Sequence, residues 1–486
     1  MRIHKLVCAF LAFVFLVSCS DENDKQPKET AIFDEKNLSK LTEDEFKVLV
    51  RMRNPKSRVS VKEAVEQTDW VINFMNVGES GVTRKISSIS ALTSDNAEFA
   101  KALKSNGIEV PDTLIYVVNF ADSLGFAIIS ADTRIDDPLI GFSGSGSLKD
   151  SIDNPGMVIF LEHLEDYMLN SIIEAERQKD SLIGGIWEKL DVETGTKATS
   201  LPLISVSSLR VEATDIVYPL VRVEWGQGAP FNNSLKDKGC TDDEGEIKNG
   251  GRVLVGCVAV AVAHIISYWK YPTKIGKYSF DWAKMNEYTG NTDPLDYPYM
   301  AQTHISSASA SIQSQVANLM ERIGSGVNMD YGCNESGAGK HSGANFLLAY
   351  GYSLYKMTNN HVSLPILVSY DSKTAIASIK RKEPLIARGC SKKDNGIFFT
   401  SYGKCHQWVI DGYIPRQTTT TIEGKPISFD DDYIHHNWGW YGNYNGYFKS
   451  GIFNSRSKSY NLAPETKSYE VGNYQYEVQI IPSIRR

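Results

Sequence analysis

The stretch "VGCVAVAVAHIISYWKYP", from Val255 to Pro272, decides how the C-terminal part of the chain folds. Its valines alternate with alanines, which by propensity suits a strand. The alanines favour helix, however, and the apolar run up to the proline is long for a strand. We therefore predict a buried helix after Gly256. Cys257 then lies in its first turn, where the helix dipole and free N–H groups lower the pKa of a thiol.

This stretch alone leaves the role of Cys257 open. A buried structural cysteine is the more common fate of a cysteine in an apolar run. A nucleophile needs a histidine to transfer the proton, a third group to orient the imidazole, and donors for the oxyanion. The rest of the chain contains a candidate for each of these partners.

His406 is the candidate base, in "GKCHQWVIDGYI", where alternating residues indicate a half-buried strand. Asn437 is the candidate orienting group, in the aromatic stretch "HHNWGWYGNYNGYF". Trp438 and Trp440 follow it, and on one face of a strand they would shield a buried hydrogen bond from water. Each feature alone also fits a polar residue at a strand start or a plain aromatic core.

Gln227, in "VEWGQGAPFN", is the candidate oxyanion donor, because a side-chain amide beside a glycine can present its N–H to a carbonyl oxygen. Alone it would be interpreted as a turn residue. Together the four stretches resemble the streptopain-type cysteine peptidases, the C10 group of papain-like enzymes. The matching stretches are "WGQGAPFN" (Trp225–Asn232), "GCVAVA" (Gly256–Ala261), "HQWVIDGY" (His406–Tyr413) and "NWGW" (Asn437–Trp440), in the papain-like order.

The resemblance implies an α+β fold with a papain-like peptidase domain, in which a central buried helix packs on an antiparallel sheet. A smaller α+β pro-domain precedes it, because "GFAIISADTRIDDPLIGFSGSG" is similar to the family's inhibitory propeptide. The expected division is a signal peptide at 1–19, a polar tether at 20–33, an inhibitory pro-region at 34–200 and the peptidase domain at 201–486.

The resemblance also implies roles for single residues. Cys257 is the nucleophile, His406 accepts and returns the proton, Asn437 orients the imidazole, Gln227 completes the oxyanion hole, and Trp438 shields the contact between Asn437 and His406. The segment "VNMDYGCNESGAG" is similar to the substrate cleft, so the residues expected near a bound peptide are Ser336, Gly337 and Trp440. No metal or cofactor is expected.

Three departures from the family pattern stand near these residues. Cys405 replaces the usual glycine before the histidine, Gln407 adds bulk after it, and Phe231 lacks a tyrosine hydroxyl. None removes a catalytic group. They leave the efficiency of the site open.

The N-terminus predicts export. "MRIHKLVCAFLAFVFLVSCS" has a charged start and an apolar core too short for a comfortable transmembrane helix. "LVSC" resembles a bacterial lipobox, which would lipidate Cys19; the alternative is an ordinary signal peptide. We expect an exported lipoprotein at the outer membrane or cell surface, with release after processing as the alternative, and no other membrane attachment.

The net charge and the cysteine content bear on the expected binding partners and on the presence of a free thiol. A net charge of -7 gives no reason to expect nucleic acid as a partner. The resemblance implies protein or peptide substrates and the chain's own pro-region as partners, and we expect a monomer. Five cysteines remain beyond Cys8 and Cys19, and an odd number suggests a free thiol. The pairing of Cys240, Cys333, Cys390 and Cys405 stays open: a turn at Asn395-Gly396 would put Cys390 opposite Ser401 rather than Cys405.

Patterns elsewhere predict five further features. They are helical patches at 42–52 and 60–67, a hairpin over Asp112–Asp132, a long helix from Asn154, a polar linker at 191–200, and a helix over Ser309–Val327. The predicted function is that of a secreted cysteine endopeptidase zymogen acting through a thioester. The alternatives are a papain-like amidase or transglutaminase, and an inactive surface-binding lipoprotein.

Overall fold

The computed structural model describes residues 35–53, 57–76, 83–93, 97–149, 152–190, 209–210, 215–286, 308–354, 367–391, 405–422, 425–454 and 478–486. Within these ranges no helix is long and apolar enough to cross a membrane. The predicted signal peptide with Cys19, the polar tether, the linker at 191–200 and the turn at Asn395-Gly396 lie outside them. Below, the N-terminal region means residues 35–190 and the C-terminal region means residues 215–486.

The helices begin where the sequence signals place them. The Asn154 side chain accepts the N–H groups of Gly156 and Met157 at 2.9 and 3.2 Å, and Pro155 occupies the first turn, so the predicted start of the long helix is confirmed. The helices are α1 (Glu35–Leu38), α2 (Glu43–Arg51), α3 (Val61–Asn76), α4 (Ala97–Ser105), α5 (Pro155–Lys189), α6 (Cys257–Trp269), α7 (Trp282–Met285), α8 (Ala310–Gly326), α9 (Ser342–Ala349) and α10 (Ser372–Lys380).

All the strand pairs are antiparallel, and the predicted hairpin over 112–132 is confirmed as β2 and β3. The strands are β1 (Ile86–Leu92), β2 (Ile115–Phe120), β3 (Phe126–Ser130), β4 (Leu139–Ser143), β5 (Leu209–Arg210), β6 (Lys274–Ile275), β7 (Tyr278–Ser279), β8 (Val368–Ser369), β9 (Leu385–Cys390), β10 (Cys405–Ile422), β11 (Lys425–Asn437), β12 (Gly446–Lys449) and β13 (Gln479–Ile481).

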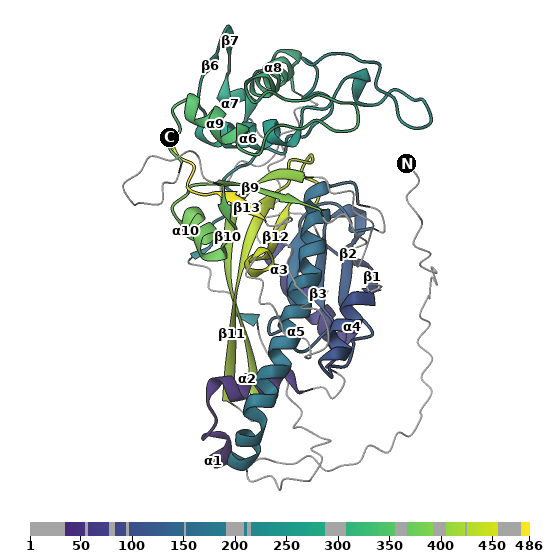
Figure 1. Cartoon of the computed structure of the whole chain (residues 1–486), viewed down its shortest axis with the longest axis vertical. Helices are drawn as coiled ribbons and strands as arrows, with labels where there is room; N and C mark the ends of the chain where they lie inside the picture. The colour runs from purple at the N-terminus through teal and green to yellow at the C-terminus, as the bar shows by residue number, and fades with distance from the viewer. Residues whose placement is uncertain are drawn as a thin grey trace.

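One sheet runs through both regions, in the order β1-β2-β3-β4-β12-β11-β10-β9-β13-β8, with β5 paired to β10 (Figure 1). The regions join where β4 pairs with β12. Glycines permit this close approach. A Cβ on Gly141 would lie 2.3 Å from the Phe448 ring, and one on Gly446 would lie 2.2 Å from the Phe142 carbonyl oxygen. The expected pro-domain and peptidase domain therefore share a sheet.

Helices cover the two faces of the C-terminal part of this sheet. The core around α6 includes Val409 and Ile386, whereas the core around α5 includes Trp408 and Ala387. This alternation confirms the predicted α+β class, with a central buried helix on an antiparallel sheet. It corrects the half-buried strand expected around His406, because β10 is buried on both faces from His406 to Ile414.

The far end of the long β10–β11 hairpin is also enclosed by the N-terminal region. Ile427 and Phe429 pack with Phe46 and Leu49 of α2 and with Ile186 of α5. Figure 1 shows α5 running alongside this hairpin, with α2 at its tip. The N-terminal region thus contacts the C-terminal strands in three places: along β12, on the face that α5 covers, and at the tip of the β10–β11 hairpin.

A buried charge cluster lies at the junction. The Arg416 guanidinium on β10 donates to the carboxylate of Asp137, which lies between β3 and β4, and both side chains are fully buried. The Tyr433 hydroxyl also donates to Asp137, at 3.1 Å, and the Gln67 side chain accepts from Arg416 at 2.8 Å. Burial alone would raise the pKa of Asp137, but Arg416 and Lys449 hold it below its usual value.

This cluster yields a stability prediction. In a Cys257→Ala background, Arg416→Met should lower the free energy of unfolding by about 3–5 kcal/mol, because it removes the direct ion-pair partner of the buried Asp137 carboxylate. The double variant Arg416→Met/Asp137→Asn should recover part of the loss. Urea unfolding of the full chain measures both values. Equal losses in the single and double variants would contradict the coupling.

Candidate active site

Cys257 is the first residue of α6, as predicted, and it is the free cysteine among the residues that the structure describes. Gly256 before it has a φ of 89°, and a Cβ there would lie 2.6 Å from Met329 Sδ and 3.1 Å from the Ser336 carbonyl oxygen. Only glycine fits this approach to the helix. Burial raises the pKa of the thiol, although the N–H groups of Gln407, Val258 and Cys257 itself point at the sulfur and lower it.

His406 lies near the start of β10, but its ring faces away from α6. Its Nε2 is 2.8 Å from the Trp438 carbonyl oxygen, and since a carbonyl only accepts, Nε2 carries the proton. The ring stacks on Trp408, with centroids 6.2 Å apart, and meets Trp440 edge-on at 6.4 Å. Burial lowers the pKa of His406 to about 4, so the imidazole is neutral.

Asn437 ends β11 and points to the other face of the sheet. It pairs with Val409, its Nδ2 donates to the Val223 carbonyl at 2.8 Å, and its Oδ1 accepts from the Gly439 N–H at 3.3 Å. His406 therefore bonds to a backbone carbonyl rather than to the Asn437 amide. The structure brings Cys257 next to the backbone of Gln407, one residue from His406, but it does not assemble the three side chains into one site.

The N-terminal end of α5 packs beside His406. A Cβ on Gly156 would lie 2.3 Å from the Trp438 ring, and one on Gly389, the cross-strand neighbour of His406, would lie 3.0 Å from Ile159. Trp438 is fully buried, and its Nε1 donates to the Tyr444 carbonyl at 2.8 Å. The N-terminal region thus occupies the face of the sheet towards which His406 is turned.

Trp438 and Trp440 were predicted to lie on one face of a strand, and this prediction is wrong. β11 ends at Asn437, and Trp438 and Trp440 belong to the turn that leads to β12. The Trp440 ring and the Trp438 carbonyl contact His406 because the turn folds back over the start of β10. Both residues therefore lie on a connection outside the strand pairs of the sheet.

Gln227 is buried, and its carbonyl accepts the Val255 N–H at 2.9 Å, two residues before Cys257. Tyr441 holds the same loop, because its hydroxyl accepts the backbone N–H groups of Gly228 and Gln227. A Cβ on Gly226 would lie 2.5 Å from the Tyr441 ring. The loop that carries Gln227 is therefore fixed between α6 and the turn after Asn437.

The predicted cleft segment lies next to Gly256. The Ser336 hydroxyl donates to the Leu254 carbonyl at 2.8 Å and accepts the Gly332 N–H at 3.1 Å. Around the position of a Gly337 Cβ there is open space. Ser336 thus supports the approach to the nucleophile, and Gly337 leaves room beside it.

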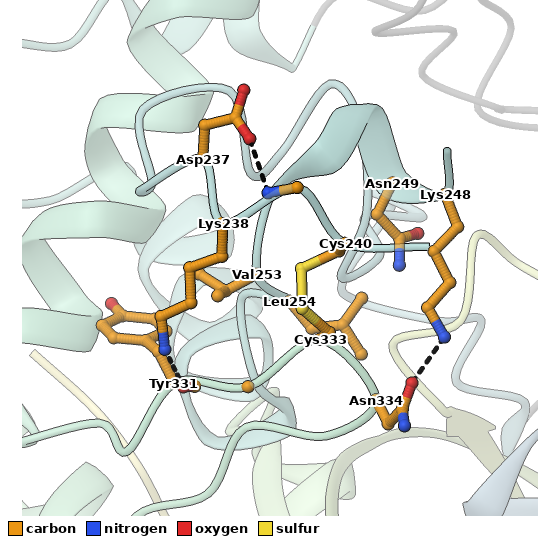
Figure 2. Close-up of a disulfide and its surroundings, with 12 residues drawn as sticks. Asp237, Lys238, Cys240, Lys248, Asn249, Val253, Leu254, Tyr331, Cys333 and Asn334 are labelled. Carbon is orange, nitrogen blue, oxygen red and sulfur yellow. Dashed lines mark hydrogen bonds between the residues drawn. A yellow bond between two sulfur atoms is a disulfide. The ribbon is translucent and has the colours of Figure 1, made fainter. Parts of the chain in front are cut away.

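A disulfide between Cys240 and Cys333 fastens this segment to the loop before α6 (Figure 2). Figure 2 shows two lysines of that loop reinforcing the connection. Lys238 donates to the Tyr331 carbonyl at 3.1 Å, and Lys248 donates to the Asn334 side chain. The sequence had left this pairing open.

A second disulfide joins Cys390 and Cys405, directly before His406. The two residues face each other across β9 and β10, with Cα atoms 3.8 Å apart, so the expected pairing of Cys390 with Ser401 is wrong. Of the five cysteines beyond the predicted signal, four are thus paired. The free thiol suggested by their odd number is confirmed as Cys257.

Sequence analysis missed two groups beside these residues. Tyr441 was hidden among neighbouring aromatic residues in "NWGWYGNYNGYF", and its positive φ of 57° has no sequence signal. Glu224 packs against Gly442, where a Cβ would lie 2.4 Å from its carboxyl carbon. Burial raises the pKa of Glu224 to about 8. The position of Glu224 in the sequence, directly before Trp225 and three residues before Gln227, was the one available signal.

Comparison with known proteins gives two family matches. The Peptidase C10 family matches residues 225–448, and the Spi protease inhibitor family matches residues 72–168. Streptopain of Streptococcus pyogenes is 25% identical over 376 residues, which covers 74% of this chain and 79% of streptopain. The thiol protease/hemagglutinin PrtT of Porphyromonas gingivalis is 22% identical over 377 residues, 75% of this chain and 37% of that protein.

Among solved structures, a prointerpain A fragment of Prevotella intermedia is 21% identical, with a TM-score of 0.43. The match covers 78% of this chain and 98% of the fragment.

These matches define the class. The chain is a cysteine-type peptidase, a hydrolase, made as a zymogen with an inhibitor-like pro-region. More particularly, residues 225–448 resemble the Peptidase C10 family and residues 72–168 resemble the Spi protease inhibitor family, so an inhibitor-like pro-region precedes the peptidase-like part.

The buried His406 leads to a prediction of how the free energy of unfolding depends on pH. The pKa of His406 is about 4, against about 6.5 for an unfolded histidine. The unfolded chain therefore binds more protons between these values, so this contribution to stability is complete above about pH 6.5 and is lost as the pH falls through 4.

In a Cys257→Ala background, His406→Gln keeps a donor for the Trp438 carbonyl but does not titrate. Between pH 7 and 4.5 it should lose about 2 kcal/mol less unfolding free energy than its parent does, since each pKa unit corresponds to about 1.4 kcal/mol. Urea unfolding at several pH values measures the difference. Above pH 7 the two curves should run parallel, and parallel curves over the whole range would contradict the prediction.

Proposed function

We propose that this chain is an exported zymogen of a cysteine endopeptidase whose active site consists of Cys257, His406, Asn437 and Gln227. The observation that carries the proposal is the position of the Cys257 thiol. It lies at the start of a buried helix, accepts N–H groups there, and receives the N–H of the residue after His406. A thiol among free N–H groups, one residue from a histidine, is suited to nucleophilic catalysis.

Activation requires His406 to turn towards α6. Residues 405–408 of β10 pair with β9, but the pairing with β11 begins only at Val409. One edge of this short segment is therefore without a strand, and its backbone can rotate at the cost of the bond to the Trp438 carbonyl. While α5 packs on Trp438 and beside Gly389, His406 stays on the wrong face. Removal of the pro-region frees that face.

In the activated site, Asn437 accepts a hydrogen bond from the imidazole and so fixes its tautomer, and Trp438 shields that bond from water. Gln227 and the Cys257 backbone N–H donate to the oxyanion. The buried position of Gln227 and its link to Val255 support this role, because they place it beside the helix that carries Cys257. Ser336, Gly337 and Trp440 contact the bound peptide.

The reaction has two halves. The Cys257 thiolate attacks the scissile carbonyl, and His406 gives its proton to the leaving amine, so a thioester forms as the peptide bond breaks. His406 then takes a proton from water, which attacks the thioester, releases the carboxylic acid and leaves the Cys257 thiolate beside the His406 imidazolium. The proton returns to the site at the end, and no metal or cofactor takes part.

Export and anchoring complete the proposal. The charged and apolar N-terminus directs export, and the lipobox-like "LVSC" marks Cys19 as the residue that receives the lipid. The protein is then a monomer held at the outer membrane or cell surface by its lipid. Cleavage between about Lys197 and Tyr218 separates the pro-region from residues 201–486 and releases the peptidase.

Self-processing tests the nucleophile. Residues 20–486 should lose their pro-region by cleavage near residue 200, whereas the Cys257→Ala form should stay intact, because it lacks the attacking thiol. Gel electrophoresis and mass spectrometry of both proteins, with casein hydrolysis as the activity assay, give the result. Equal processing of both forms would exclude Cys257 as the processing nucleophile.

The oxyanion role of Gln227 has its own test. Gln227→Ala should lower kcat about 100- to 1,000-fold with a smaller change in KM, because the lost donor acts on charge that develops in the transition state. Gln315→Ala is the matched control, since its amide bonds to the Asp281 backbone at the end of another helix. Peptide hydrolysis measures both variants. A change confined to KM would assign Gln227 to substrate binding.

A further inference from the structure

A row of polar side chains crosses three strands beside the nucleophile. Gln479 of β13 pairs with Arg388 of β9, and Arg388 pairs with Gln407 of β10. Directly paired residues point to the same face of a sheet, with Cβ atoms about 5 Å apart. Ile386 and Val409, two residues along each strand, pack in the core around α6, so the row lies on the face that carries Cys257.

Gln407 connects the row to the nucleophile. Its backbone N–H points at Cys257 Sγ, and its side chain donates to the Lys340 carbonyl at 3.4 Å. The Oε1 of Gln407 is buried and has no hydrogen-bond partner in the described part of the chain. The polar row therefore begins at the reacting sulfur and runs outwards, from the buried Gln407 to the half-buried Arg388 and Gln479.

Arg388 differs from Arg416 and Arg134, two arginines that are buried in the sheet and its surroundings. Arg416 is paired with Asp137, and Arg134 is paired with Asp132 and Glu176. Arg388 makes no ion pair with a described carboxylate. Burial lowers its pKa, and the group that opposes this is the Cys257 thiolate. A half-buried guanidinium without an anion is costly, and a carboxylate held by two N–H groups would remove that cost.

From this arrangement we infer that Arg388 forms a substrate subsite for an acidic side chain within two residues of the scissile bond. The inference rests on the proposed function, since it takes Cys257 as the nucleophile. An extended peptide advances about 3.3 Å per residue, so a cation one strand away from the contact between Gln407 and the sulfur meets side chains close to the bond. The two neighbouring amides, of Gln407 and Gln479, can donate to the second carboxylate oxygen.

Matched peptides test the subsite. Fluorogenic peptides carry either Glu or Gln at one of the two positions on each side of the cleaved bond, and the activated wild-type protein is assayed with each pair. At one position the Glu peptide should have a kcat/KM at least about tenfold above its Gln partner, as expected for a charge-assisted hydrogen bond. In Arg388→Gln this ratio should fall to about one, and Arg388→Lys should keep part of it.

Arg322→Gln is the control, because Arg322 is already paired with Glu321, and it should keep the wild-type ratio. High salt should reduce the ratio in the wild type. The wild-type measurement alone is decisive even if Arg388→Gln does not fold.

Three results would overturn the inference. The first is a ratio of one at all four positions in a wild-type protein that cleaves casein. The second is an equal loss on Glu and Gln peptides in Arg388→Gln, which would assign Arg388 to stabilisation of the thiolate. The third is a preference confined to peptides that end beside the bond, which would indicate a terminal carboxylate. A processed wild type that cleaves neither casein nor any peptide contradicts the proposed function, and this inference with it.

Discussion

The pairing of β4 with β12, stabilised by the buried ion pair of Asp137 with Arg416, is the constraint on which the rest of this structure depends. It joins the pro-region to the peptidase sheet by backbone hydrogen bonds, and the ion pair fixes the register because a shifted strand would leave both charges buried and unpaired. Once the edge is fixed, α5 can only lie across the neighbouring face of the sheet. Gly156 then meets Trp438, and the space towards which His406 points is closed.

The turn between β11 and β12 transmits this constraint to the site. It contacts His406 through the Trp438 carbonyl, the loop of Gln227 through the Tyr441 hydroxyl, and Glu224 through Gly442. One short segment therefore touches the proposed base, His406, and the loop of the proposed oxyanion donor, Gln227. Because β12 is also the strand that pairs with β4, departure of the pro-region removes support from one end of the turn while Asn437 holds the other. Reorientation of His406 and adjustment of the oxyanion loop are thus expected to occur together.

Local sequence signals predicted the elements that depend on local physics. The start of α6 at Cys257, the cap of α5 at Asn154 and the hairpin of β2 and β3 follow from propensity, capping and period. The pairing of Cys390 with Cys405 was missed because it depends on strand register across a long connection, which no local pattern sets. Tyr441 and Arg388 were missed because each acts through a partner far away in the sequence. The positions of Cys257 and His406 were predicted, but the direction of the His406 ring depends on α5, which packs from the other region.

In the proposed site, inhibition by the pro-region is electrostatic as well as steric. Catalysis needs a thiolate and an imidazolium as partners, yet burial raises the pKa of Cys257 and lowers the pKa of His406 to about 4, so near neutral pH neither group carries its charge. Because Cys257 and His406 lie on opposite sides of β10, each charge would have to be buried without the other. When His406 turns to the side of β10 that faces Cys257, each charge stabilises the other, and the N–H groups at the start of α6 favour the thiolate further. The pro-region therefore need not fill the cleft to suppress the enzyme; holding one imidazole on the wrong side of β10 keeps the nucleophile neutral.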